Sequence, residues 1–120
     1  MRSLDTDIND RGSRYAVSGG PAADRAAVLA FLRTLKRDKR FARASHNSWA
    51  VMLKGDTGLT PLKGDDGEGG AGNIILRMIE AAGLCDHLIV VTRWYGGKPL
   101  GSDRFRHVQE AARLYLSTLS

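Results

Sequence analysis

The stretch HLIVVTRWY, residues His87–Tyr95, is a continuous run rich in β-branched and aromatic residues. An unbroken run of this kind is typical of a central strand that is buried on both faces. The loop GGKPLG follows it, and Ser102 and Asp103 then offer side chains that suit a helix N-terminus. Apolar residues recur at helical spacing beyond them, which predicts a helix over about 102–119. A buried strand that leads into a helix indicates a layered α/β fold.

The segments before this strand extend the same pattern. A period of 3.6 predicts a helix from Ile74 that ends at Gly83, and another from Pro21 to about Asp38. Two strand-like runs, 45–55 and 59–64, flank the turn GDTG and predict a hairpin with its second strand at the sheet edge. A first strand is predicted at Ser13–Gly19. The order is therefore β-α-β-β-α-β-α, an α+β two-layer fold with a mixed sheet of about four strands and helices on one face.

The bulk properties predict one domain in a non-membrane protein. The chain has 120 residues, which suits a single domain at 13–120, and the polar residues 1–12 predict a flexible tail. The start MRSLDTDIND has no apolar signal region, and no apolar run approaches the ~18 residues of a membrane span. The single cysteine, Cys85, excludes an internal disulfide and a cysteine-rich zinc site. We expect a cytoplasmic protein.

Basic residues are concentrated in one place. The chain has a formal net charge of +5, and six of its eighteen basic residues lie in RTLKRDKRFAR, Arg33–Arg43. Such a cluster can contact RNA or an acidic protein surface. The alternative is the solvated end of a helix, where exposed charges act only over a short range.

The loop KGDDGEGGAG, Lys63–Gly72, precedes the predicted helix at Ile74. Glycines before a helix N-terminus resemble a phosphate site, but the loop lacks the lysine of a P-loop. Asp65, Asp66 and Glu68 would repel a bare phosphate unless Mg²⁺ bridged them. The simplest alternative is a turn whose carboxylates favour the helix dipole. Structure, ligand contact and catalysis all remain open for this loop.

A second loop region, TRWYGGKPLGSDRFRH, combines basic and aromatic residues, which is typical of protein and RNA contact surfaces. If the two loops are neighbours, Asp66 or Glu68 can pair with Arg93 or Arg104. His46 suits either acid–base chemistry or a structural hydrogen bond, since no nucleophile motif accompanies it. The candidate binding residues are Asp65, Asp66, Glu68, Arg93, Trp94, Lys98, Asp103, Arg104 and His46, with no catalytic or metal-binding residue among them.

Four motifs together resemble one known family. RGSRYAV (11–17), ASHNSWAV (44–51), DDGEGGAG (65–72) and VVTRWYGGKPLGSDRFRHV (90–108) are similar, in order and spacing, to the Impact/YigZ N-terminal domain family, and to its eukaryotic Impact branch. The resemblance implies a fold like the second domain of a ribosomal small-subunit protein. Gly69, Gly70, Pro99 and Ser102 depart from the usual family residues.

The resemblance also implies a function without catalysis or cofactor. Eukaryotic Impact proteins regulate translation during amino-acid starvation, by binding the ribosome-associated activator of the kinase that phosphorylates initiation factor 2; they also associate with actin. These proteins usually carry a further N-terminal domain of the RWD type, which we expect to be absent here. The partner is therefore expected to be a protein, with the ribosome, RNA or actin as further partners. An RNA-binding module and a Mg²⁺-dependent enzyme that acts on a phosphorylated ligand are the alternatives.

Overall fold

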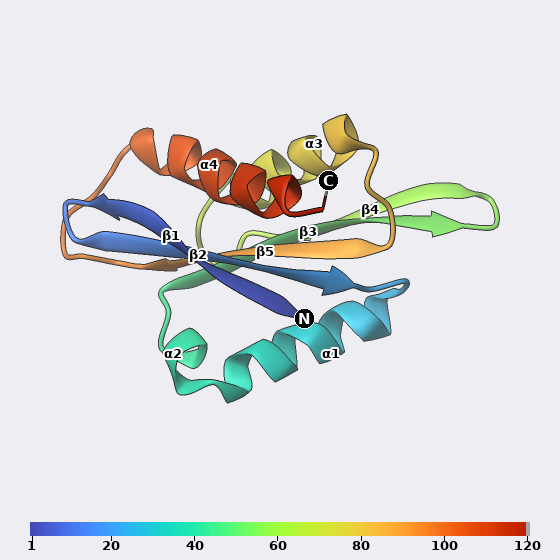
Figure 1. Ribbon diagram of the computed structural model, residues 1–120, viewed down its shortest axis with the longest axis horizontal. Helices are drawn as coiled ribbons and strands as arrows, with labels where there is room; N and C mark the ends of the chain where they lie inside the picture. Colours follow the sequence, from blue (N-terminus) through green and yellow to red (C-terminus); the bar gives the residue numbers. More distant parts are fainter. Residues whose placement is uncertain (120) are drawn as a thin grey trace.

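The computed structural model describes residues 1–119 and contains one five-stranded sheet (Figure 1). The strand order is β1-β2-β5-β3-β4, and every neighbouring pair is antiparallel. The strands are β1 (Arg2–Asp10), β2 (Ser13–Pro21), β3 (His46–Gly55), β4 (Gly58–Gly64) and β5 (His87–Trp94). The predicted α+β fold is confirmed, but the sheet has five strands where about four were predicted, and it is antiparallel where a mixed sheet was predicted. β2 and β3 do run parallel, but β5 lies between them and pairs antiparallel with both.

Helices cover both faces of the sheet (Figure 1). Helices α1 (Arg25–Arg37) and α2 (Lys39–Ala42) lie on one face, and α3 (Ala71–Ala82) and α4 (Asp103–Ser117) lie on the other. The prediction of helices on one face was wrong. Leu88 and Val90 of β5 pack under α1, whereas Ile89 and Val91 pack under α3 and α4. This double burial confirms β5 as the central strand that its apolar composition predicted.

Residues 1–12, predicted to be a flexible tail, form β1 and its turn to β2. Half-buried and exposed positions alternate along this strand, but polar residues at most of them mask the pattern. The register shifts between Asp5, which pairs with Ala16, and Asn9, which pairs with Arg14. At this bulge the Thr6 hydroxyl donates to the Tyr15 carbonyl over 2.7 Å. The side chain thereby replaces a backbone bond that the irregular ladder leaves out.

The helix boundaries follow local capping. α1 begins later than predicted because β2 continues through Pro21, and the Asp24 carboxylate accepts a hydrogen bond from the Ala27 N–H over 2.7 Å. α3 ends at Gly83, as predicted, where φ is 65°. The hairpin of β3 and β4 is also confirmed, with β4 at the edge. None of the helices within residues 1–119 has the length and hydropathy needed to cross a membrane.

The antiparallel order brings distant segments to one end of the sheet. The starts of β2 and β3 and the ends of β4 and β5 meet there, because each pair runs in opposite directions. The loop from β4 to α3 and the loop from β5 to α4 therefore leave the sheet at the same end. This placement makes the two candidate loops neighbours.

Candidate functional site

The loop between β4 and α3 is held by its own carboxylates. Asp65 accepts hydrogen bonds from the N–H groups of Gly70 at 3.1 Å and Gly72 at 2.8 Å, at the start of α3. Asp66 accepts from the Asn47 N–H at 2.7 Å, which ties the loop to β3. The two bonds to Asp65 satisfy backbone donors that a helix start leaves unpaired. Asp65 and Asp66 therefore fix the course of the loop.

Glu68 turns inward from this loop and is only 2% exposed. Its two carboxylate oxygens accept from one nitrogen, Nη1 of Arg93, at 2.9 and 3.1 Å. Arg93 is itself 6% exposed, and its Nη2 donates to the Ser13 hydroxyl over 3.3 Å. The predicted pairing between the two loop regions is confirmed for Glu68 and Arg93. A buried carboxylate requires such a partner, because an uncompensated charge in the interior is costly.

The sheet register explains how Arg93 reaches this position. Tyr15 on β2, Arg93 on β5 and His46 on β3 are directly opposite one another across three neighbouring strands. Residues opposite one another in a ladder point to the same face, so the three side chains form a row beneath the loop. The Arg93 guanidinium lies 5.9 Å from the Tyr15 ring and 5.7 Å from the Tyr95 ring. Burial raises the pKa of the Tyr15 hydroxyl to about 12.

Two further basic side chains connect Glu68 to the surface. Arg104 Nε lies 3.7 Å from Glu68 Oε1, and His46 Nε2 lies 3.5 Å from Oε2. The His46 Nδ1 group donates to the Asp66 carbonyl over 2.9 Å. The side chain of Arg104 is 37% exposed and stacks on Phe105, with 4.5 Å from Cζ to the ring centroid. We call Glu68, Arg93, Arg104, His46 and Tyr15 the Glu68 cluster. In it the Glu68 carboxylate lies within 3.7 Å of three basic side chains, of which Arg104 and His46 reach solvent.

The other predicted binding residues lie elsewhere. Trp94 follows Arg93 on β5 and points to the opposite face, where its Nε1 donates to the Arg40 carbonyl over 3.0 Å. Asp103 pairs with Arg11 at 2.6 Å. Lys98 is exposed in the loop after β5. The nine predicted residues therefore do not form one site, and their roles in binding stay predictions.

A separate cluster joins β1 to α4 and was not predicted from the sequence. His107 Nε2 lies 2.8 Å from Asp10 Oδ2, and Arg11 Nε lies 3.0 Å from Asp10 Oδ1. Hydrogen bonds from Arg11 and His107 lower the pKa of Asp10 to about 2. No sequence signal pointed to this pairing, because Asp10 and His107 are distant in the chain and β1 was not recognised.

The carboxylates of the loop are not arranged as a metal site. Asp65 and Asp66 accept backbone N–H groups, and Glu68 faces Arg93. Within residues 1–119, no three histidine, cysteine, aspartate or glutamate side chains come together in a way that could hold a metal ion. The loop carboxylates are therefore engaged with backbone N–H groups and with an arginine.

Comparison with known proteins places this geometry in a family. The sequence model of the Impact N-terminal domain matches residues 11–116. The chain belongs to the Impact N-terminal domain family. It is 36% identical to the human protein IMPACT over 108 residues, and the aligned region covers 88% of this chain and 34% of the human protein. It is 32% identical to the IMPACT homolog of Saccharomyces cerevisiae over 108 residues, and the aligned region covers 88% of this chain and 42% of the yeast protein.

Two solved structures share the fold of this Impact domain. One is the two-domain translational regulator Yih1, with a TM-score of 0.59 and 32% identity over 92% of this chain and 44% of that chain. The other is described as a hypothetical protein, with a TM-score of 0.82 and 24% identity over 96% of this chain and 56% of that chain. At this identity, the match to the second structure shows a shared fold only. The chain spans about a third to two-fifths of the length of the curated relatives named above.

Proposed function

We propose that this chain is a protein-binding module in the regulation of translation, with the Glu68 cluster at its contact surface. The observation that carries the proposal is the match to Yih1, a translational regulator, over 92% of the chain at 32% identity. The finer proposal follows the family resemblance. The partner is the ribosome-associated activator of the kinase that phosphorylates initiation factor 2, and binding restrains that kinase.

The exposed part of the site supports protein recognition. Arg104 and His46 reach the surface beside the loop, and Tyr95 is 51% exposed next to Arg93. Arginine and tyrosine are enriched in protein interfaces, where they supply contact area together with hydrogen bonds. The buried Glu68–Arg93 pair fixes the loop beneath them, so little order has to be gained on binding. An acidic patch on the partner is the complement that this surface favours.

Affinity purification from the cells that express the protein tests the proposal. The variant Lys98→Ala/Arg104→Ala removes the charge of Arg104 in the Glu68 cluster and that of exposed Lys98 in the loop after β5. The matched control Lys54→Ala/Arg77→Ala removes the same two residue types from exposed positions elsewhere. We expect the first variant to recover about tenfold less activator than wild type, as a loss of roughly 1.4 kcal/mol implies, and the control to recover the wild-type amount. Equal recovery by both variants, or no activator with the wild-type chain, would show the proposal to be wrong.

We also propose that the module acts without catalysis. The support is that the loop carboxylates accept backbone donors or face an arginine. Isothermal titration with Mg²⁺ and a nucleotide is expected to give no binding heat. Binding that disappears in Asp66→Ala, while the circular dichroism spectrum is unchanged, would instead favour an enzyme.

A further inference from the structure

The net positive charge of the chain comes from one segment. Residues 33–43, which we call the basic segment, hold six of the eighteen basic residues and one of the thirteen acidic residues. This segment alone therefore carries the excess of +5, and the remaining twelve basic and twelve acidic residues balance. It comprises the last part of α1, all of α2 and the residue that follows. A concentration of charge on this scale gives one face of the molecule a field that attracts anions.

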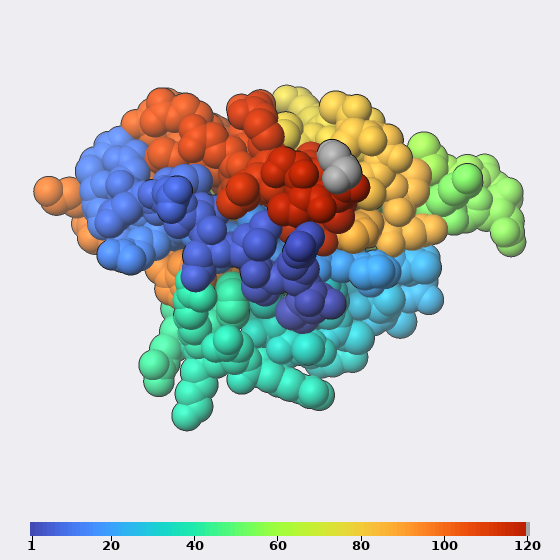
Figure 2. Space-filling model, in the orientation of Figure 1, coloured from blue at the N-terminus to red at the C-terminus, as the bar shows by residue number. Residues whose placement is uncertain are grey.

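The fold points these charges into solvent. α1 buries Val28, Phe31 and Leu35 against the sheet. Arg33 and Arg37 are one turn apart on the opposite side of that helix, since helical neighbours recur at four residues. All six basic residues of the segment are exposed: Arg33, Lys36, Arg37, Lys39, Arg40 and Arg43. Figure 2 shows long side chains of this part of the chain, coloured teal, projecting from the surface below the sheet.

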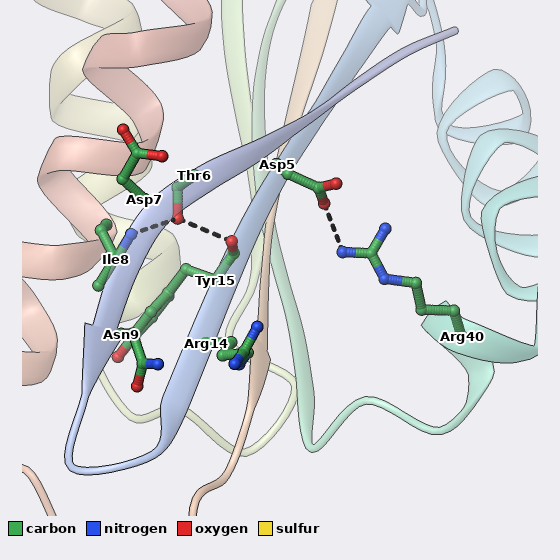
Figure 3. A pocket seen from close by; sticks show the side chains of 8 residues that line it. All are labelled: Asp5, Thr6, Asp7, Ile8, Asn9, Arg14, Tyr15 and Arg40. Carbon is green, nitrogen blue, oxygen red and sulfur yellow. Dashed lines mark hydrogen bonds and ion pairs between the residues drawn. The ribbon is translucent and has the colours of Figure 1, made fainter.

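Only one of these six residues forms an ion pair within residues 1–119. Arg40 pairs with Asp5 on β1 and stacks on Trp94, with 4.7 Å from Cζ to the ring centroid. Figure 3 shows Asp5 and Arg40 facing each other beside a cavity of about 380 Å³ that Arg14 also lines. Arg40 therefore anchors α2 to the sheet. The other five are available to an external anion, and Arg14 adds another exposed guanidinium beside Arg40.

Favourable contact with the helix dipole explains only part of this arrangement. Lys36 and Arg37 lie in the last turn of α1, where positive charge stabilises the helix. Arg33 and Arg37, however, are like charges four residues apart, which destabilises a helix. Lys39 and Arg43 lie beyond α1 altogether. A polyanion would offset the repulsion among these groups.

The surroundings favour a nucleic acid over an acidic protein. Protein interfaces are built around large apolar or aromatic residues. Within residues 1–119 the basic segment itself exposes no large hydrophobic residue: Phe41 is buried, and the exposed Leu29 lies on α1 one turn before Arg33. A single leucine does not make the apolar centre that a protein interface needs. Contacts with phosphate groups need only exposed lysine and arginine.

We propose that the basic segment binds the phosphate backbone of RNA without reading its sequence. The choice of RNA over DNA rests on the proposed role in translation, whereas the charge distribution stands independently of it. This surface lies on the α1 and α2 face of the sheet, opposite the α3 and α4 face that holds the Glu68 cluster (Figure 1). The chain thereby offers one face to a protein and the other to RNA.

The salt dependence of binding gives the first test. Fluorescence anisotropy of the full chain with a labelled RNA of roughly 20 nucleotides reports the binding constant. With five phosphate contacts the slope of log K against log salt is expected to be about −3.5, so affinity falls about 100-fold between about 50 and 200 mM salt. A binding constant that does not change over this range overturns the proposal, as does the lack of binding at the lower salt.

Matched charge variants locate the contact. Arg33→Gln/Arg37→Gln removes two contacts and is expected to reduce the slope to about −2. Arg77→Gln/Arg113→Gln removes the same net charge from exposed positions of α3 and α4, and is expected to leave a slope close to wild type. Equal effects of the two variants would mean that net charge alone drives binding, which overturns the placement on the basic segment.

Two further measurements distinguish RNA from other anions and from the proposed protein function. Polyglutamate at the same charge concentration is expected to compete poorly with RNA, and equal competition overturns the proposal. Arg33→Gln/Arg37→Gln is expected to recover the kinase activator as well as wild type does. If the wild-type chain fails to bind RNA but still recovers the activator, this inference alone is refuted. Loss of activator with RNA binding intact refutes only the proposed function.

Discussion

The Glu68 cluster and the basic segment both gather arginines, but they hold the charge differently. The guanidinium of Arg93 is buried and donates to both oxygens of Glu68. Arg33 and Arg37 are exposed and make no ion pair within residues 1–119. A buried ion is tolerated only with a partner, so removal of one member of the pair lowers the free energy of unfolding strongly. An exposed charge contributes little to folding and remains available for binding.

Removal of the buried carboxylate should have the largest effect. Glu68→Ala leaves Arg93 buried without its partner, and we expect the free energy of unfolding to fall by about 3 to 5 kcal/mol. Urea denaturation followed by circular dichroism measures this loss. As a control, Asp103→Ala breaks a pair with Arg11 whose side chains are 40% and 43% exposed, and should cost about 1 kcal/mol or less. Similar losses in the two variants would remove the distinction between the regions.

Burial around Glu68 should also appear in the titration of Tyr15. The pKa of its hydroxyl is raised from 10.0 to about 12, a rise equivalent to roughly 2 to 3 kcal/mol. The unfolded chain loses this proton first, so the free energy of unfolding should decrease as pH rises from about 10 towards 12. Absorbance titration of wild type and Tyr15→Phe isolates this group. A Tyr15 midpoint near 10 in the folded protein would contradict its burial.

The loop beside Glu68 should depend on Asp65 to a smaller degree. Asp65 accepts the N–H groups of Gly70 and Gly72, as an N-cap side chain does, so Asp65→Ala should cost about 1 to 2 kcal/mol. Thermal unfolding measures the effect. Asp56→Ala, at the exposed turn between β3 and β4, provides the comparison and should remain close to wild type. A stable Asp65→Ala protein would mean that the glycines alone set the loop conformation.

The basic segment should give the smallest effect on stability. Arg33→Gln/Arg37→Gln is expected to change the free energy of unfolding by no more than about 0.5 kcal/mol, since both side chains are exposed. Urea denaturation of this variant and of Arg77→Gln/Arg113→Gln compares the loss of unfolding free energy on the two sides of the sheet. A loss above about 1 kcal/mol would assign the basic segment a structural role and weaken the comparison.

Much of the fold could be predicted because the main elements carry strong local signals. The apolar run of β5, the helical periods of α3 and α4, and the β3–β4 turn are all explicit in the sequence. β1 was missed because a polar edge strand has little composition to distinguish it from a tail. The second helical layer was missed because an amphipathic helix shows that it has a buried side, but not which sheet face receives it.

The candidate site was predictable only in part, for a related reason. The pairing of Glu68 with Arg93 followed from the opposite charges of two loops, and the structure confirms it. Trp94 was grouped with Arg93 although consecutive strand residues point to opposite faces. Tyr15 entered the cluster through its register with Arg93, a contact between residues far apart in the sequence.

The sequence by itself determined the periodic elements, the charge excess of residues 33–43 and the family motifs, because each is written in neighbouring residues. Only the tertiary structure decided that β5 separates β2 from β3, and that the two arginine-rich regions lie on opposite sides of the sheet. Strand order and face assignment depend on which apolar surfaces pack together across the whole chain. That choice placed Glu68 in the interior beside Arg93 and left Arg33 and Arg37 in solvent.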